Sequence, residues 1–174
     1  MRTLVGSLVT LRPITEADLP SVARASMPWA QQGESEADVL LRLHDRFRGQ
    51  AALAGLDYVI EIDGRGIGNI QARQDLYLLG LFEIGIVVFE DVDKSKGVGR
   101  EALALMTAQL FDHQDAYRVQ LNTDVGNTAM RRAAEAAGFM FEGVLRGFWP
   151  PKGDQPPADY AMYAKTKHDH EDVT

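Results

Sequence analysis

The sequence contains no cysteine among its 174 residues. Disulfide bonds, thiolate nucleophiles and cysteine-ligated zinc are therefore excluded, and the chain is not a secreted disulfide scaffold. Long apolar runs are also missing, because the two longest, residues 76–82 and 84–89, are far shorter than the roughly 20 residues of a membrane-spanning helix. The N-terminal segment is too short and too interrupted by polar residues for a signal sequence. We therefore expect a soluble, cytoplasmic protein without membrane contact.

Basic residues are fewer than acidic ones, with 18 lysines and arginines against 25 aspartates and glutamates and a formal charge of -7. The chain therefore lacks the basic footprint of a nucleic-acid-binding protein, and we expect no nucleic-acid partner. The same negative charge would favour encounter with a cationic small molecule or peptide. An amine substrate is compatible with this composition.

Proline and glycine, at 7 and 16 residues, are too few for a disordered chain, and 45% of the residues are hydrophobic. The length favours a single domain. The sequence shows no internal repeat and no linker that would divide it. We predict one domain over residues 1–174, with a polar and frayed tail from about residue 165.

The hydrophobic periodicity predicts helices and strands in mixed order. Strands are expected at residues 8–13, 58–62, 67–72, 118–122, 139–146 and 160–164, with one or two more within 76–89. Helices are expected at residues 15–25, 35–47, 97–112 and 128–137. Asp63 and Gly64 favour a tight hairpin because both residue types tolerate a positive φ. This order of elements predicts an α/β fold with a mixed sheet.

A glycine-rich loop between an apolar strand and a helix is the most informative segment. It consists of Lys94, Ser95, Lys96, Gly97, Val98, Gly99 and Arg100. A helix N-terminus after such a loop forms an anion site, because free N–H groups and the positive end of the helix dipole face the ligand. Three cations also gather here in an otherwise acidic chain. The segment predicts a phosphate-binding site, with a solvated helix end as the alternative.

Two kinds of phosphate-binding motif compete for this loop. Residues 97–102 satisfy the dinucleotide fingerprint G-x-G-x-x-G/A. That fingerprint places its first glycine directly after the strand, whereas residues 90–96 intervene here. The Walker A pattern fails because no Gly-Lys-Ser/Thr follows. A nucleotide-dependent oxidoreductase is therefore the weaker hypothesis.

The loop resembles the acyl-CoA pyrophosphate loop Q/R-x-x-G-x-G/A of the GNAT N-acetyltransferase superfamily, with Lys94 where Gln or Arg is usual. The similarity extends over nearly the whole chain. Residues 82–86 resemble the strand before the loop, and residues 127–139 resemble the next helix with its Gly-Phe ending. Residues 142–146 and 159–163 resemble the closing strands of the ribosomal-protein-alanine acetyltransferase (RimJ/RimL-type) branch. The resemblance implies a single-domain GNAT fold, with the mixed sheet of an α+β arrangement.

The resemblance also implies acetyl-CoA as co-substrate and assigns residues to it. Its pyrophosphate would be cradled by the backbone N–H groups of Gly97 and Gly99, with the other loop residues close by: Lys94, Ser95, Lys96, Val98 and Arg100. The strand residues Val87, Val88 and Phe89 would pair with the pantetheine arm and offer an N–H group to the thioester oxygen. Asn127 would reach the same arm, and its residue type is also suited to cap the helix that follows.

Acyl transfer to an amine needs a neutral nitrogen, yet an alkylamine with a pKa near ~10.4 is mostly protonated at neutral pH. A general base must take the proton. Glu83 is the candidate because it is the single charged residue within the apolar stretch 76–89. Burial in an apolar strand would make its carboxylate a stronger base. A structural ion pair within the sheet is the alternative role for Glu83.

Two positions depart from the family pattern. Many members have a tyrosine at the position of Ala134 to protonate the leaving thiolate, and the alanine-acetyltransferase branch often has a serine at the position of Met130. Either the thiolate leaves without help, or another hydroxyl group, such as that of Tyr160 or Tyr163, donates the proton.

The two histidines near the C-terminus lack a third ligand, so no metal is expected.

The sequence therefore predicts an N-acetyltransferase that moves an acetyl group from acetyl-CoA to a primary amine by direct attack, without a covalent enzyme intermediate. A longer donor such as succinyl-CoA is the first alternative. A catalytically silent acyl-CoA-binding or regulatory domain is the second. The acceptor is left open between a protein N-terminus and a small molecule, and a homodimer is compatible with the resemblance.

Overall fold

One mixed sheet organises the computed structural model, which describes residues 1–49, 55–93 and 96–171. Within these ranges the sheet has eight strands in the order β1-β2-β3-β4-β5-β6-β8-β7. The strands are β1 (Leu4–Val5), β2 (Thr10–Pro13), β3 (Gly55–Ile62), β4 (Arg65–Gln74), β5 (Leu81–Val88), β6 (Arg118–Asp124), β7 (Met140–Trp149) and β8 (Ala158–Thr166). Neighbouring strands are antiparallel except β5 and β6, which are parallel. The predicted α/β class with a mixed sheet is confirmed.

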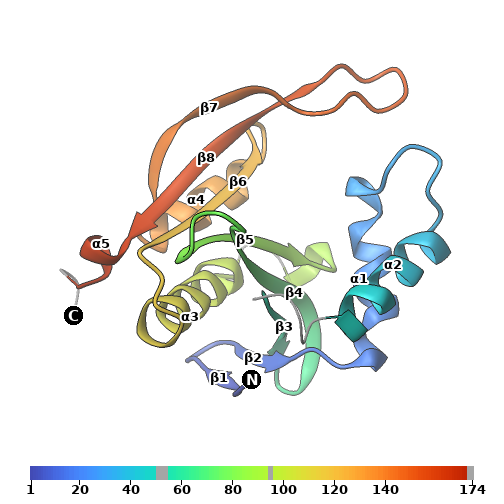
Figure 1. The fold of residues 1–174 in the computed structure, drawn as a ribbon. Coiled ribbons are helices and arrows are strands. Elements are labelled where there is room, and N and C mark those ends of the chain that lie inside the picture. The colour runs from blue at the N-terminus through green and yellow to red at the C-terminus, as the bar shows by residue number, and fades with distance from the viewer. Residues whose placement is uncertain (50–54, 94–95, 172–174) are drawn as a thin grey trace.

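Helices cover both faces of this sheet (Figure 1). They are α1 (Leu19–Ser26), α2 (Glu36–Gly49), α3 (Val98–His113), α4 (Thr128–Ala136) and α5 (Lys167–Glu171), with the short 3-10 turns η1 (Glu16–Asp18), η2 (Met27–Trp29) and η4 (Asp91–Asp93). Helices α3 and α4 pack on one face, and α1 and α2 pack on the other. Over the residues that the structure describes, no helix combines the length and the apolar composition needed to cross a bilayer.

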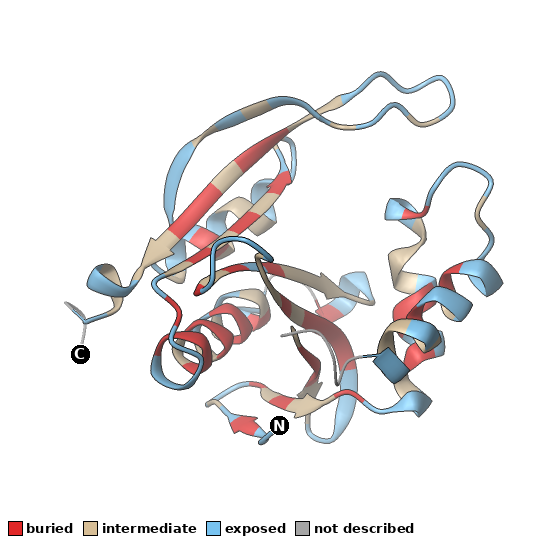
Figure 2. Ribbon diagram, in the orientation of Figure 1, coloured by how far each residue is buried: buried red, intermediate tan, exposed pale blue. Residues whose placement is uncertain are grey.

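The core divides between the two faces because successive side chains of a strand point to opposite sides. In β3, Tyr58 and Ile60 join a main core with α3, whereas Val59 joins a smaller cluster with α1 and α2. Figure 2 shows the buried residues gathered along α3 and the central strands. Leu103 and Met106 of α3 are completely buried at the centre of the main core.

The connections on either side of β4 follow local side-chain chemistry. Asp63 and Gly64 have φ values of 50° and 76°, which confirms the predicted tight hairpin between β3 and β4. The stretch 76–89 forms a single strand, because its first residues make a turn instead. The Asp75 carboxylate accepts hydrogen bonds from the N–H groups of Tyr77 and Leu78, both at 2.8 Å, and so holds the chain in that turn.

The prediction of a frayed tail is wrong for residues 165–171, which complete β8 and form α5. The Asp169 carboxylate accepts hydrogen bonds from the N–H group of Thr166 at 2.8 Å and from its hydroxyl group at 2.7 Å. The ring of His170 stacks on Phe111 of α3 with 5.0 Å between ring centroids. The segment is polar in sequence but is held by a helix that lies far from it along the chain.

Replacing Leu103 by alanine is expected to lower the free energy of unfolding by about 2–5 kcal/mol, because the change leaves a cavity in the main core. Urea unfolding followed by circular dichroism measures the loss. Leu41→Ala is the matched control, since Leu41 is 63% exposed on α2, and its loss should stay below about 0.5 kcal/mol. Equal losses in the two variants would contradict the placement of the core.

Candidate active site

Strands β5 and β6 pair over only three residues each. Beyond this pairing the two strands diverge (Figure 1). The paired segments are residues 81–83 and 118–120, although β5 continues to Val88 and β6 to Asp124. We call the diverging segments, residues 84–88 and 121–124, the fork. Unpaired strand edges bind extended ligands through main-chain hydrogen bonds. The fork therefore suits a ligand that carries amide groups along its length.

The backbone of β5 divides its N–H groups between β4 and the fork. Phe89, just after β5, donates its N–H group to the carbonyl oxygen of Ile67 at 2.8 Å. Because alternate residues of an antiparallel pair bond to the partner strand, Val87 also bonds to β4, whereas Ile86 and Val88 face the fork. Of the three strand residues expected to pair with the pantetheine arm, Val88 is the one whose N–H group points into the fork.

The glycine loop ends at the N-terminus of α3. Gly97 is the N-cap residue and has a φ of 84°, a left-handed conformation that glycine adopts without strain from a Cβ atom. No described side chain caps this helix. Its first N–H groups, those of Val98, Gly99 and Arg100, have no partner within the helix and can bind an anion.

The remaining loop residues differ in their surroundings. Val98 is buried in the main core, and Lys96 and Arg100 are exposed. A Cβ atom on Gly99 would lie 3.5 Å from the Cβ atom of Ala133, so α4 packs closely against this position. The predicted ligands Lys94 and Ser95 lie outside the described residues.

A buried carboxylate holds the start of the loop. Asp93 is 1% exposed and receives two hydrogen bonds from the guanidinium group of Arg65, at 2.9 and 2.7 Å. These bonds keep the pKa of Asp93 below its ordinary value, although burial acts in the opposite direction. The pair ties the loop to the β3–β4 hairpin. The sequence analysis missed it because Arg65 lies far from Asp93 along the chain, with no local signal to connect them.

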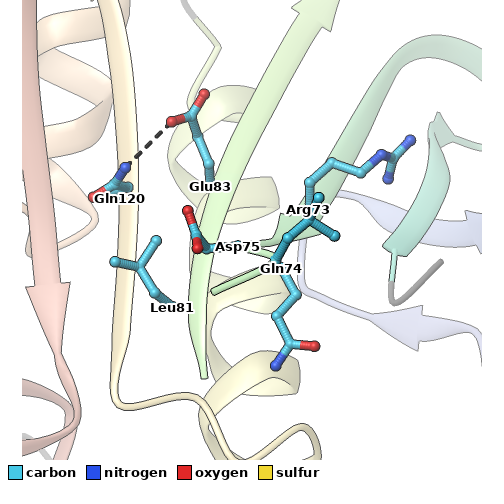
Figure 3. A pocket seen from close by; sticks show the side chains of 7 residues that line it. Arg73, Gln74, Asp75, Leu81, Glu83 and Gln120 are labelled. Carbon is cyan, nitrogen blue, oxygen red and sulfur yellow. Dashed lines mark hydrogen bonds between the residues drawn. The ribbon is translucent and has the colours of Figure 1, made fainter. Parts of the chain in front are cut away.

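Glu83 lies at the last paired position before the fork, opposite Gln120. Its Oε2 accepts a hydrogen bond from Nε2 of Gln120 at 3.2 Å (Figure 3). The side chain is exposed, so the expectation that it is buried is wrong. Strand alternation explains the difference: Phe82 and Ile84 face the main core, which turns Glu83 to the opposite face.

A cavity of about 300 Å³ opens beside Glu83 (Figure 3). It is lined by Arg73, Gln74, Asp75, Leu76, Leu81, Glu83 and Gln120. The guanidinium group of Arg73 points away from Glu83 in Figure 3 and donates to Oδ2 of Asp57 at 2.7 Å. Arg73 is thus directed to another carboxylate, and the cavity presents the negative charge of Glu83 to a ligand.

The face of β6 that carries Gln120 is polar along its length. Gln120, Asn122 and Asp124 alternate with side chains that are buried toward α3 and α4. Paired residues of neighbouring strands share a face, so this polar row lies on the same side of the sheet as Glu83. A cationic acceptor approaching from this side meets carboxylate and amide groups.

The two tyrosines considered as proton donors lie on opposite faces of β8. The hydroxyl group of Tyr163 donates to Glu135 at 2.9 Å and accepts from Arg131 at 3.1 Å, so α4 engages it. Tyr160 lies on the face of the polar row of β6. Burial raises the pKa of Tyr160, and a hydrogen bond from Trp29 partly opposes this shift. Of the two, Tyr160 is the one placed on the side of the candidate base.

Helix α4 has no hydroxyl group at the two positions where members of the family that the sequence resembles carry a tyrosine or a serine. Ala134 is completely buried, and Met130 packs against the main core. Asn127 caps the helix, since its Oδ1 accepts the N–H group of Met130 at 3.2 Å. This cap uses the carbonyl oxygen of the side chain and leaves its amide nitrogen as a donor for a ligand.

The family model for the acetyltransferase (GNAT) domain matches residues 9–140. Solved structures of acetyltransferases superpose over almost the whole chain. Spermidine N-acetyltransferase from Vibrio cholerae, in a dodecameric structure, has a TM-score of 0.80 and 17% identity, covering 97% of this chain and 99% of that one. RimL, a ribosomal-protein acetyltransferase in complex with coenzyme A, has a TM-score of 0.77 and 17% identity, covering 95% and 98%. AAC(6')-Ib in complex with paromomycin and acetyl-CoA has a TM-score of 0.74 and 20% identity, covering 95% and 97%.

A comparison with curated proteins found no match. The family match confirms the superfamily that the glycine loop and its flanking strands predicted. Identities this low show a shared fold with the solved structures and leave the RimJ/RimL-type branch a prediction.

Because the pKa of Asp93 is lowered in the folded protein, its ionised form stabilises the fold. This contribution is fully present above the ordinary pKa of 3.8 and is lost as the pH falls through the lower folded value. Asp93→Asn should therefore lower the free energy of unfolding at neutral pH, with a difference from wild type that shrinks in acid.

Urea unfolding between about pH 7 and pH 3 measures this difference. Glu90→Gln, an exposed change just before Asp93, serves as control and should shift stability by less than about 0.5 kcal/mol. A difference for Asp93→Asn that stays constant with pH would show that the ionised pair is not its cause.

Proposed function

We propose that this chain, which belongs to the GNAT acetyltransferase family, transfers the acetyl group of acetyl-CoA to a primary amine by direct attack. One observation carries the proposal: the β5 strand of the fork, with Glu83 at its base, leads to a helix N-terminus that no described side chain caps. Relatives in complex with coenzyme A and acetyl-CoA support this choice of donor.

The donor would bind mainly through main-chain groups. The pyrophosphate meets the first N–H groups of α3, where the helix dipole favours negative charge, with Lys96 and Arg100 exposed nearby. The amide groups of the pantetheine arm bind along the edge of β5. The N–H group of Val88 then points at the thioester oxygen, where it stabilises the negative charge that develops during attack.

Glu83 takes a proton from the ammonium form of the acceptor, directly or through one water molecule. The neutral nitrogen attacks the thioester carbon and the C–N bond forms. The C–S bond then breaks with its electron pair passing to sulfur, and the nitrogen releases its second proton, which the thiolate or solvent water takes up. A simple thiol has a pKa near ~8.5, so the thiolate is a competent leaving group. The hydrogen bond from Gln120 orients the carboxylate of Glu83 at the start of the fork.

Direct attack is favoured over a covalent enzyme intermediate, because the chain has no cysteine to accept the acyl group by thioester exchange. Tyr160 is the hydroxyl group that would return a proton to sulfur, since it shares the face of the polar row of β6. The acidic lining on this face and the formal charge of -7 favour an acceptor that carries positive charge.

The first experiment measures release of free CoA from acetyl-CoA in the presence and absence of a polyamine, an aminoglycoside and a peptide with a free N-terminus. We expect release that depends on one of these amines, and faster release from acetyl-CoA than from succinyl-CoA. Faster release from succinyl-CoA would show that succinyl-CoA, and not acetyl-CoA, is the preferred acyl donor. Tight CoA binding without turnover for any amine would favour a silent acyl-CoA-binding domain.

Glu83→Gln is expected to lower kcat by about 100-fold or more while changing the KM for acetyl-CoA by less than about twofold. The loss should narrow as the pH rises, because more of the acceptor is then neutral without the help of a base. Glu90→Gln is the matched control, because it removes a carboxylate that lies after the end of β5 and outside the fork. This change should leave kcat unchanged. Wild-type kcat in Glu83→Gln would contradict the role of general base.

A further inference from the structure

We infer that Glu101 is a positioning residue for the donor site: its carboxylate fastens the first turn of α3 to the turn between β1 and β2. The inference rests on the proposed binding of CoA at the N-terminus of α3. It concerns a residue that the glycine-loop pattern does not include, four positions after the N-cap Gly97.

Three consecutive backbone N–H groups converge on the Glu101 carboxylate. Its Oε1 accepts the N–H group of Ser7 at 2.9 Å and also the hydroxyl group of Ser7. Its Oε2 accepts the N–H groups of Leu8 at 2.7 Å and Val9 at 2.6 Å. A chain that wraps its amide groups around an anion in this way forms a specific binding site, and here the anion is a side chain of α3 itself.

The Glu101 carboxylate also has little free space around it. A Cβ atom on Gly6 would lie 2.7 Å from Cδ of Glu101, so this position has no room for a side chain while the carboxylate stays in place. The N–H group of Gly6 donates to the carbonyl oxygen of Val9 at 2.9 Å and closes the turn. On the other side, a Cβ atom on Gly97 would lie 3.7 Å from Cδ2 of Leu8. The turn at residues 6–9 therefore packs against both ends of the first turn of α3.

The charge of Glu101 would by itself oppose an anionic ligand one helical turn away. Burial raises the pKa of this carboxyl group, but the hydrogen bonds from Ser7, Leu8 and Val9 together hold it below its ordinary value. Glu101 is therefore ionised at neutral pH, and the N–H groups around it offset its charge. A carboxylate lies this close to the proposed phosphate site because it binds the N–H groups of the turn at residues 6–9.

The sign of the effect on CoA affinity separates this role from simple electrostatics. If the charge of Glu101 acted only through space, its removal would tighten CoA binding. If Glu101 only stabilised the helix N-terminus, its removal would lower stability and leave affinity unchanged. A positioning role predicts weaker binding, because the N–H groups of the first turn no longer converge on the phosphates.

The test measures the Kd of CoA by calorimetry at fixed ionic strength, together with kcat at saturating acetyl-CoA and the KM of the amine. Glu101→Gln should weaken CoA binding by about tenfold or more, because its amide nitrogen faces N–H donors, while kcat and the amine KM change by less than about twofold. Glu90→Gln removes the same charge from an exposed position before the loop. It should leave the Kd unchanged or slightly lower.

Gly6→Ala provides a second variant that keeps the charge. It displaces the Glu101 carboxylate by steric contact and should also weaken CoA binding, so the test holds even if Glu101→Gln does not fold. Hydrogen exchange at Ser7, Leu8 and Val9 should accelerate in both variants without ligand. Wild-type affinity in both variants, or tighter binding in Glu101→Gln, would overturn the inference. Failure of the wild-type protein to bind CoA would instead overturn the proposed function.

Discussion

The short parallel pairing between β5 and β6 is the constraint on which the candidate site depends. Each strand keeps a full antiparallel partner on its other side, β4 for β5 and β8 for β6, so the two can part after residues 83 and 120 and remain ordered. Their inner edges then keep main-chain donors and acceptors for a ligand. The same divergence leaves Glu83 at the point where the strands separate, with Gln120 as its hydrogen-bond partner.

An acidic chain that binds an anionic donor must control its own carboxylates near the site. Asp93 and Glu101 lie on either side of the glycine loop, and both are engaged by donors from distant segments. Arg65 neutralises Asp93, and the turn at residues 6–9 surrounds Glu101. The negative charge that stays open, that of Glu83 and the polar row of β6, lies on the face where an amine would approach. The two sides of the fork thus differ in charge, as the proposed donor and acceptor require.

Local patterns predicted those features whose cause is local. The positive φ values of Asp63 and Gly64, the cap made by Asn127 and the glycine at the start of α3 all arise from interactions within a few residues. Two expectations were wrong, one because of strand alternation and one because of a distant contact. The apolar neighbours of Glu83 in sequence lie on the other face of β5, and the polar tail is held by Phe111 of α3.

The resemblance of the glycine loop and its flanking segments to the GNAT pattern was enough to predict the superfamily, which the family match confirms. Periodicity and turn chemistry act over short distances, so the sequence also predicted most of the helices and strands and proposed a phosphate site at the glycine loop. The sequence could not predict which N–H group of β5 faces the fork or which tyrosine shares the face of Glu83. It also could not predict which carboxylates are neutralised. These properties depend on strand register and on partners up to 94 residues away, such as Ser7 and Glu101. Pairings of that kind exist only once the sheet has closed against α3.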